Sequence, residues 1–175
     1  MTPGSQTIEE ILRNIFENVN GWLRFAEAKN GALIGISLAV LFGLVKPEVR
    51  DLLNAPLWVI GFSMLLLIIS ILVALGSFVP RLVLTIPPQT GGRDSNILFF
   101  GHIAGFDVSS YLEKVQGVLG VKEVSEMARV YANQIVINSN IALGKLRLFT
   151  IAFWFFVSGL LLPVAAKALL SLKGM

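Results

Sequence analysis

The chain has 175 residues, of which 55% are hydrophobic and 14% are charged, and its mean hydropathy of +0.77 is typical of a polytopic membrane protein. Because there is no cysteine, disulfide frameworks and thiol chemistry are excluded, and one histidine with eleven dispersed carboxylates leaves little room for a metal site. The formal charge of +3 is modest, so the distribution of the basic residues is more informative than their sum.

Residues 5–29 are expected to form an amphipathic helix that contains a capping box, Thr7 with Glu10. Its apolar residues recur at steps of three and four: Ile8, Ile11, Leu12, Ile15, Phe16, Val19, Trp22, Leu23 and Ala26. We expect no signal peptide in this segment, because Glu9 and Glu10 stand where its basic region should be. The uncharged segment 30–45 is too short to cross about 30 Å of hydrocarbon at about 1.5 Å per residue, so we expect it to continue the first helix.

The second span is predicted within residues 52–80, which carry no charge. Ser63, Ser70 and Ser77 recur every seven residues along it and therefore share one face of the helix. That face either packs on neighbouring helices or lines an aqueous path, and we predict that these three serines line a pore.

Residues 81–120 are the part of the chain that lacks the pattern of a long helix. Two short apolar runs, 81–88 and 96–105, are separated by Pro-Pro and a turn-rich segment, which predicts a small β-hairpin or an ordered loop. The whole segment between the second and third spans, about 65 residues, can form a compact module but is too small to bury much core alone, so we expect the first helix and further copies of the chain to stabilise it.

A second capping box, Ser110 with Glu113, predicts a short helix that Gly120 closes. Beyond it, residues 121–170 have the pattern of one helix of about 50 residues, long enough at about 1.5 Å per residue to cross a bilayer and project beyond it. Residues 149–166 are uncharged and strongly apolar, and they are predicted to be the third span.

The half of this helix that precedes the span, residues 130–144, has no charge but five polar side chains. Such a stretch is costly in lipid and unusual in water, so we expect it to be buried in protein. One face of the helix follows steps of four and three: Met127, Tyr131, Gln134, Asn138, Ile141, Lys145 and Leu148. This face suits a ligand sensor joined to a membrane span, or alternatively a hydrogen-bonded seam that fixes register and oligomeric state.

We therefore predict a mainly α polytopic membrane protein with three transmembrane helices, long cytoplasmic helical extensions and a small cytoplasmic module. Its predicted parts are a cytoplasmic amphipathic helix at 1–30, two spans with a short external loop at 31–80, a cytoplasmic sensor module at 81–148, the third span at 149–170 and an external tail at 171–175. With the amino terminus inside, ten basic residues are cytoplasmic, as the positive-inside rule requires: Arg13, Arg24, Lys29, Arg81, Arg93, Lys114, Lys122, Arg129, Lys145 and Arg147. Four are external: Lys46, Arg50, Lys167 and Lys173.

Three blocks of sequence carry a resemblance to a known family. They are FAEAKNGALIG at 25–35, NILFFGHIAG at 96–105 and EMARVYANQIVINSNIALGKLRLFTIAFWF at 126–155. In their order and content they resemble the signature blocks of the Pycsar-type transmembrane effectors of bacterial anti-phage defence. Glu27 stands where that family more often has Asp, and Asn30 where it more often has Ala.

The resemblance implies an effector of the bacterial inner membrane that damages the membrane or forms a channel. The resemblance also implies that a nucleotide signal controls the effector. This signal is a cyclic nucleotide or an oligonucleotide made by a companion cyclase or nucleotidyltransferase. Related effectors in guard systems are instead held closed by their nucleotide. Three spans cannot enclose an aqueous pore, so the channel interpretation requires a homo-oligomer, for example a tetramer.

Candidate ligand contacts follow from the chemistry of a nucleotide, which needs cations, aromatic faces and amides. The cations are Lys29, Arg93 and Lys145; the aromatic residues are Phe99, Phe100, Tyr111 and Tyr131; the amides are Gln134 and Asn138; His102 is a weaker candidate. Structural alternatives stay open, because the phenylalanines and the histidine suit the core of the module and both lysines can pair with Glu27.

No catalytic constellation and no metal or cofactor site is predicted apart from the regulatory nucleotide, because the ionisable residues are sparse and scattered. Two alternatives to a gated channel remain. One is a membrane scaffold that recruits a cytoplasmic partner, and the other is a holin-like toxin that needs no ligand.

Overall fold

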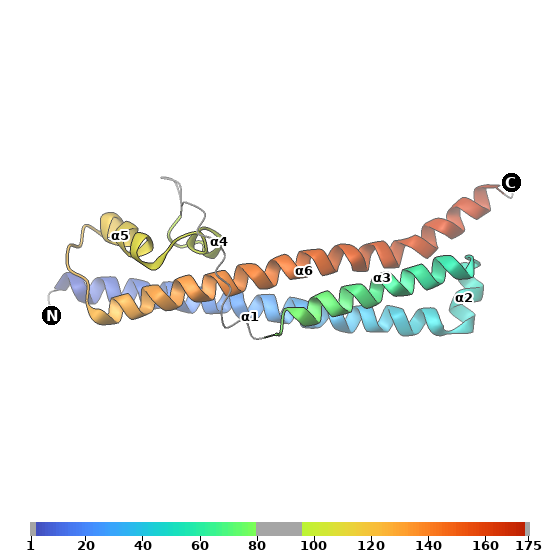
Figure 1. Ribbon diagram of the computed structural model, residues 1–175, viewed down its shortest axis with the longest axis horizontal. Coiled ribbons are helices and arrows are strands. Elements are labelled where there is room, and N and C mark those ends of the chain that lie inside the picture. The colour runs from blue at the N-terminus through green and yellow to red at the C-terminus, as the bar shows by residue number, and fades with distance from the viewer. Residues whose placement is uncertain (1–2, 80–95, 174–175) are drawn as a thin grey trace. The chain divides into compact units, whose positions relative to one another are not determined.

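The computed structural model describes residues 3–79 and 96–173. Within these ranges the protein contains helices and no strand (Figure 1). The helices are α1 (Pro3–Val45), α2 (Pro47–Leu53), α3 (Leu57–Gly76), α4 (Phe100–Ile103), α5 (Val108–Leu119) and α6 (Glu126–Lys173). The prediction of a mainly α protein is therefore confirmed.

Three of these helices, α1, α3 and α6, are long and apolar enough to cross a membrane. They correspond to the three predicted spans. As predicted, the first span continues the amino-terminal helix without a break, and the last is part of one helix of 48 residues. This helix begins at Glu126 rather than at residue 121, because the Ser125 hydroxyl accepts a hydrogen bond from the amide of Ala128 (3.1 Å) and so caps its first turn.

The chain divides into two compact units, which share α1 and α6. The first unit consists of Met1–Ala26 and Pro80–Lys145, and the second of Glu27–Val79 and Leu146–Met175.

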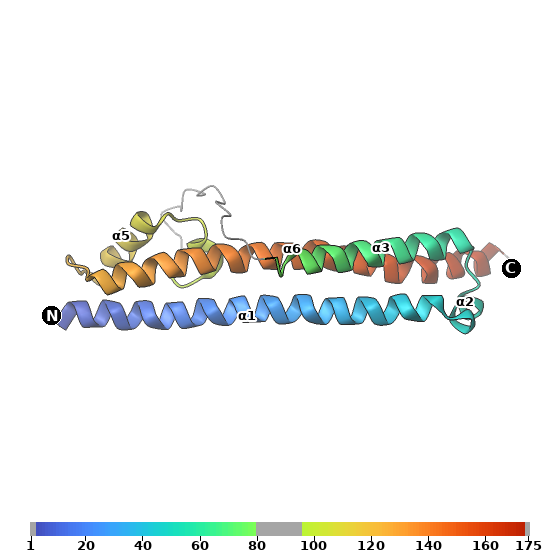
Figure 2. The same cartoon turned by 60° about the horizontal axis from the view of Figure 1, so that its bottom comes forward.

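In the first unit α1 and α6 run parallel (Figure 2), because residues with higher numbers in α1 contact residues with higher numbers in α6. Their apolar faces form a buried core. The buried side chains are Ile8, Leu12, Ile15 and Val19 of α1, and Ala128, Ala132, Ile135 and Ala142 of α6. Phe100 and Ile103 of α4 and Tyr111, Leu112 and Val115 of α5 are also buried.

The module between the spans differs from the prediction in two places. Residues 96–105, expected as a strand or loop, contain a turn in which Asn96 Oδ1 accepts from the Leu98 amide (2.8 Å), followed by α4. The other predicted run, 81–88, lies outside the described residues. Helix α5 is capped by Asp107 rather than Ser110, because the Asp107 carboxylate accepts from the Ser110 amide at 3.0 Å. Gly120 ends this helix with a φ of 67°, as predicted.

In the second unit α3 runs antiparallel to α6 and is joined to it by serine hydroxyls. Ser70 Oγ donates to the carbonyl of Ala152 at 2.8 Å, and Ser63 Oγ donates to the carbonyl of Gly159. The seven-residue spacing of the serines matches the seven residues between their acceptors. Leu33, Ala74 and Ala152 form the apolar cluster of this unit.

Gly159 and Pro163 explain why α3 approaches α6 at this point. Pro163 lies inside α6 and has no N–H, so the Gly159 carbonyl four residues earlier lacks its helical donor. The Ser63 hydroxyl supplies the missing hydrogen bond. A Cβ on Gly159 would lie 3.0 Å from the Ser63 carbonyl oxygen and 3.1 Å from Leu67 Cγ, so glycine permits the contact.

Candidate functional site

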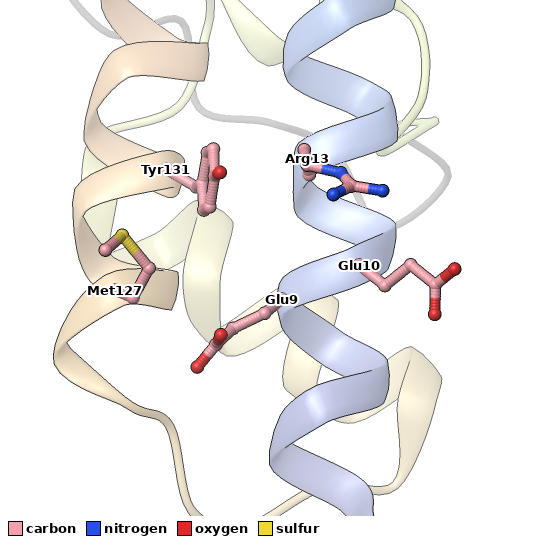
Figure 3. A pocket seen from close by; sticks show the side chains of 5 residues that line it. All are labelled: Glu9, Glu10, Arg13, Met127 and Tyr131. Carbon is pink, nitrogen blue, oxygen red and sulfur yellow. The ribbon is translucent and has the colours of Figure 1, made fainter.

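A groove in the first unit lies between α1 and the amino-terminal part of α6. It has a volume of about 370 Å³ and is lined by Glu9, Glu10, Arg13, Met127 and Tyr131. Figure 3 shows Tyr131 and Glu9 extending into the space between the two helices, whereas Glu10 points away from α6. The groove therefore combines an aromatic ring, a guanidinium group and carboxylates.

The register of the two parallel helices builds this groove. Polar and aromatic residues of α1 lie at steps of four, three and four: Glu9, Arg13, Phe16 and Asn20. The predicted face of α6 has the same spacing, in Met127, Tyr131, Gln134 and Asn138. Two parallel helices with the same spacing keep these residues side by side over several turns.

Three contacts join the two faces. Asn138 Nδ2 donates to Asn20 Oδ1 at 2.8 Å. The rings of Tyr131 and Phe16 meet edge to face with centroids 5.9 Å apart. At the end of the groove the Ser125 hydroxyl donates to the Glu9 carboxylate. Asn138 thus takes part in an interhelical hydrogen bond, while Tyr131 also lines open space.

The expected burial of residues 130–144 is found only in part. Ser139 is fully buried and Asn138 is half-buried, but Gln134 is exposed and Ile137 is 42% exposed. The buried face of α6 is rotated by one position from the predicted face. Its centre is formed by Ala128, Ala132, Ile135, Ser139 and Ala142. The amides Gln134 and Asn138 lie at the edge of this buried face.

The FFG block forms an aromatic cluster in the same unit. Phe100 is 5% exposed and its ring lies 5.0 Å from that of Trp22, so it belongs to the core. Phe99 is 44% exposed, and its ring covers Gly101, where a Cβ would lie 2.6 Å from the Phe99 Cε1 atom. His102 is exposed and its Nδ1 accepts from the Asn96 amide at 3.0 Å, so the proton of the neutral ring is on Nε2.

Tyr111 is a core residue rather than a stacking platform. Its side chain is fully buried, and its hydroxyl donates to the carbonyl of Ile97 at 3.2 Å. Burial raises the pKa of the Tyr111 phenol, because the charged phenolate would lose its hydration. A planar base cannot reach this ring in the folded chain.

Of the candidate cations, the structure describes Lys29 and Lys145, and these two belong to different units. Lys29 belongs to the second unit, where its Nζ lies 5.1 Å from the centroid of the Phe149 ring. Lys145 is half-buried at the last position of the first unit. Arg93 lies outside the described residues.

Ser63, Ser70 and Ser77 are buried within the second unit, and the first two bond to α6 as described above. Their contacts match the packing interpretation of the heptad spacing, and the pore-lining role stays a prediction about an assembly. No group of three or more His, Cys, Asp and Glu residues capable of holding a metal ion occurs in the described part of the chain.

Sequence reasoning missed Glu9, Arg13, Asn20 and Ser125 as members of the candidate site. Their signal was present in the sequence, since the polar positions 9, 13 and 20 of α1 repeat the spacing of 127, 131 and 138 in α6. Only the parallel register of the two helices shows that these stripes meet.

The comparisons with known proteins agree with this architecture. The family model described as the Pycsar effector protein domain matches residues 11–172, which include most of α1, all of α3 and nearly all of α6. No curated protein and no solved structure matches the chain. The match extends over nearly the whole sequence, and the chain therefore belongs to the Pycsar effector family, the membrane effectors of anti-phage defence that its three sequence blocks resemble.

Proposed function

We propose that this effector forms a homo-oligomeric ion channel or membrane-disrupting pore in the bacterial inner membrane, gated by a nucleotide that binds in the groove of the first unit. The observation that supports the proposal most is α6. One unbroken helix contributes Tyr131 to the groove, Asn138 to the interhelical hydrogen bond and the apolar residues of the last span to the second unit. A change of packing at the groove then acts on the same helix that crosses the membrane.

The groove has the chemistry for a nucleotide with a single phosphate charge. The Tyr131 ring offers a face for the base and the Arg13 guanidinium offers a partner for the phosphate. Glu9, which extends into the groove, can accept hydrogen bonds from amino groups of a base, and together with Glu10 it outnumbers the single arginine. Because the groove has one more carboxylate than guanidinium groups, it would repel an oligonucleotide with several phosphates more strongly than a cyclic mononucleotide with one, in agreement with the cyclic nucleotide signals of this family.

The exposed side of α6 supports self-association. Val130 is 50% exposed and Ile137 is 42% exposed, within the uncharged stretch of the helix that also carries Gln134. A second copy packed on this side would bury these side chains and the amide together. Self-association is also what three spans per chain require if they are to surround water.

Ion flux through liposomes that contain the purified chain, measured with and without cyclic mononucleotides, tests the proposal. We expect the nucleotide to change the flux, by opening or by closing the pore. Gln134→Leu and Asn138→Leu should alter this response while leaving membrane insertion intact, and Asn18→Leu, at an exposed position of α1 outside the groove, should respond as wild type.

Three results would count against the proposal. Unchanged nucleotide control in both α6 variants would assign this face to a purely structural seam. Absence of conductance under every condition would favour the membrane scaffold. Conductance and toxicity that ignore nucleotides altogether would favour the holin-like toxin.

A further inference from the structure

The second unit contains a cavity of about 240 Å³ between α1, α2 and α6. Gly43 and Leu44 come from α1, Leu53 from α2, and Pro163 and Val164 from α6. Every residue that lines the cavity is apolar. Leu44 and Pro163 are buried, whereas Val164 is 53% exposed, so the cavity has a closed floor and an open side.

Basic residues stand close in the sequence to residues that line this cavity. Arg50 is on α2, three residues before Leu53, and its Nε atom is buried without a hydrogen-bond partner. Lys167 is three residues beyond Val164 on α6, and its Nζ donates to the Leu52 carbonyl at 2.6 Å. A buried guanidinium N–H without an acceptor is unfavourable, which points to an acceptor from outside the chain.

Helix α2 also carries acidic residues. Glu48 and Asp51 belong to this short helix, and both are exposed. With Lys46, which precedes α2, the three basic residues outnumber these two carboxylates. The surroundings of the cavity therefore favour an anionic ligand over a cationic one.

We infer that this cavity binds one acyl chain of an anionic phospholipid whose phosphate accepts hydrogen bonds from Arg50 and Lys167. The lining matches an acyl chain because it is wholly apolar and most of it belongs to α1 and α6, two helices that are long and apolar enough to cross the bilayer. The phosphate matches the Arg50 Nε–H, which has no acceptor, and the Lys167 ammonium group, which reaches α2 through the Leu52 carbonyl. An apolar side chain from a second copy could fill the cavity, but a further group would then be needed to accept the hydrogen bond from Arg50 Nε.

Native mass spectrometry of the full chain, released from detergent that contains phosphatidylglycerol or phosphatidylcholine with the same acyl chains, tests this inference. We expect retention of one phosphatidylglycerol per chain, at least fivefold in excess of phosphatidylcholine. Gly43→Leu should reduce the retention at least fivefold, because its side chain fills the cavity. Gly35→Leu on the same helix is the matched control, since a Cβ at either glycine meets no atom within 4 Å.

Two further variants make the test independent of one substitution. Arg50→Gln should lower the preference for phosphatidylglycerol to about one while the cavity keeps its acyl chain. Val164→Trp should block the open side of the cavity. Because Val164 is exposed, the larger side chain can be placed there without a clash inside the protein.

The inference is overturned if both cavity-filling variants fold, by circular dichroism, and retain as much phosphatidylglycerol as wild type. It is also overturned if wild type retains neither lipid. A lipid-free dimer that Gly43→Leu abolishes would assign the cavity to a second copy and overturn it as well.

Discussion

Ser63 and Ser70 make the same type of hydrogen bond to α6, yet their removal should have different consequences. The Ala152 carbonyl that Ser70 contacts keeps its own helical donor, the amide of residue 156, so Ser70→Ala should cost about 0.6 kcal/mol, the average for a hydrogen bond between membrane helices. The Gly159 carbonyl has no helical donor because of Pro163. Ser63→Ala leaves it unsatisfied in an apolar environment and should cost about 2 kcal/mol.

A double-mutant cycle isolates this cause. Pro163→Ala restores an amide that can donate to the Gly159 carbonyl, so Ser63→Ala in that background should cost only about 0.6 kcal/mol. The interaction energy between positions 63 and 163 should therefore be about 1 kcal/mol or more. The free energies of unfolding can be measured by titrating the protein with SDS in mixed micelles and following the helical circular dichroism signal.

The reasoning is refuted by either of two results. Equal costs for the two serine substitutions would show that the proline does not matter. A cost of Ser63→Ala that is the same with and without Pro163 would show that the Gly159 carbonyl is satisfied in another way.

The remaining predictions concern the first unit and the topology. Hydrogen bonds from the side chain and the backbone of Ser110 lower the pKa of Asp107 below its usual 3.8. The Asp107 cap therefore stabilises α5 above pH 3.8, and this stabilisation is lost as the pH falls through the lowered pKa. Hydrogen exchange of the α5 amides should show this acid sensitivity in wild type but not in Asp107→Asn. In a Tyr131→Phe variant the remaining phenol, Tyr111, should ionise only above its usual pKa of 10, as measured by ultraviolet absorbance, and a titration at 10 would contradict its burial. A fluorescent reporter that folds only in the cytoplasm should be dark when fused to the carboxyl terminus, and a bright fusion would reverse the predicted orientation.

The three long helices could be predicted because each depends on a local property, an uninterrupted apolar or amphipathic pattern. Helix starts were less accurate, since several residues near a start can cap it. Ser110 with Glu113 satisfies the capping-box pattern, but Asp107 occupies the cap and Ser110 donates to it instead. Likewise, Ser125 shortens the predicted long helix at its beginning.

The sequence predicted the α6 side of the candidate site but not the α1 side. The amides and Tyr131 of α6 were identified because polar residues in an uncharged helix are conspicuous, but the buried face was placed one position away. Alanines form much of that face, and alanine is not distinctive in either a core or a surface. The α1 half of the groove could not be predicted from one helix, because it depends on the long-range register that joins Asn20 to Asn138.

The parallel packing of the first and last helices has a consequence for biosynthesis. Glu9 contacts Ser125, 116 positions later, so the amino-terminal helix emerges from the ribosome long before its partner exists. Contacts between residues so far apart in the sequence form late, because the long segment between them must first be closed into a loop. During translation the apolar stripe of α1 must be shielded by lipid, by a chaperone or by another subunit, and a prematurely terminated product would keep that stripe uncovered and become a substrate for proteolysis.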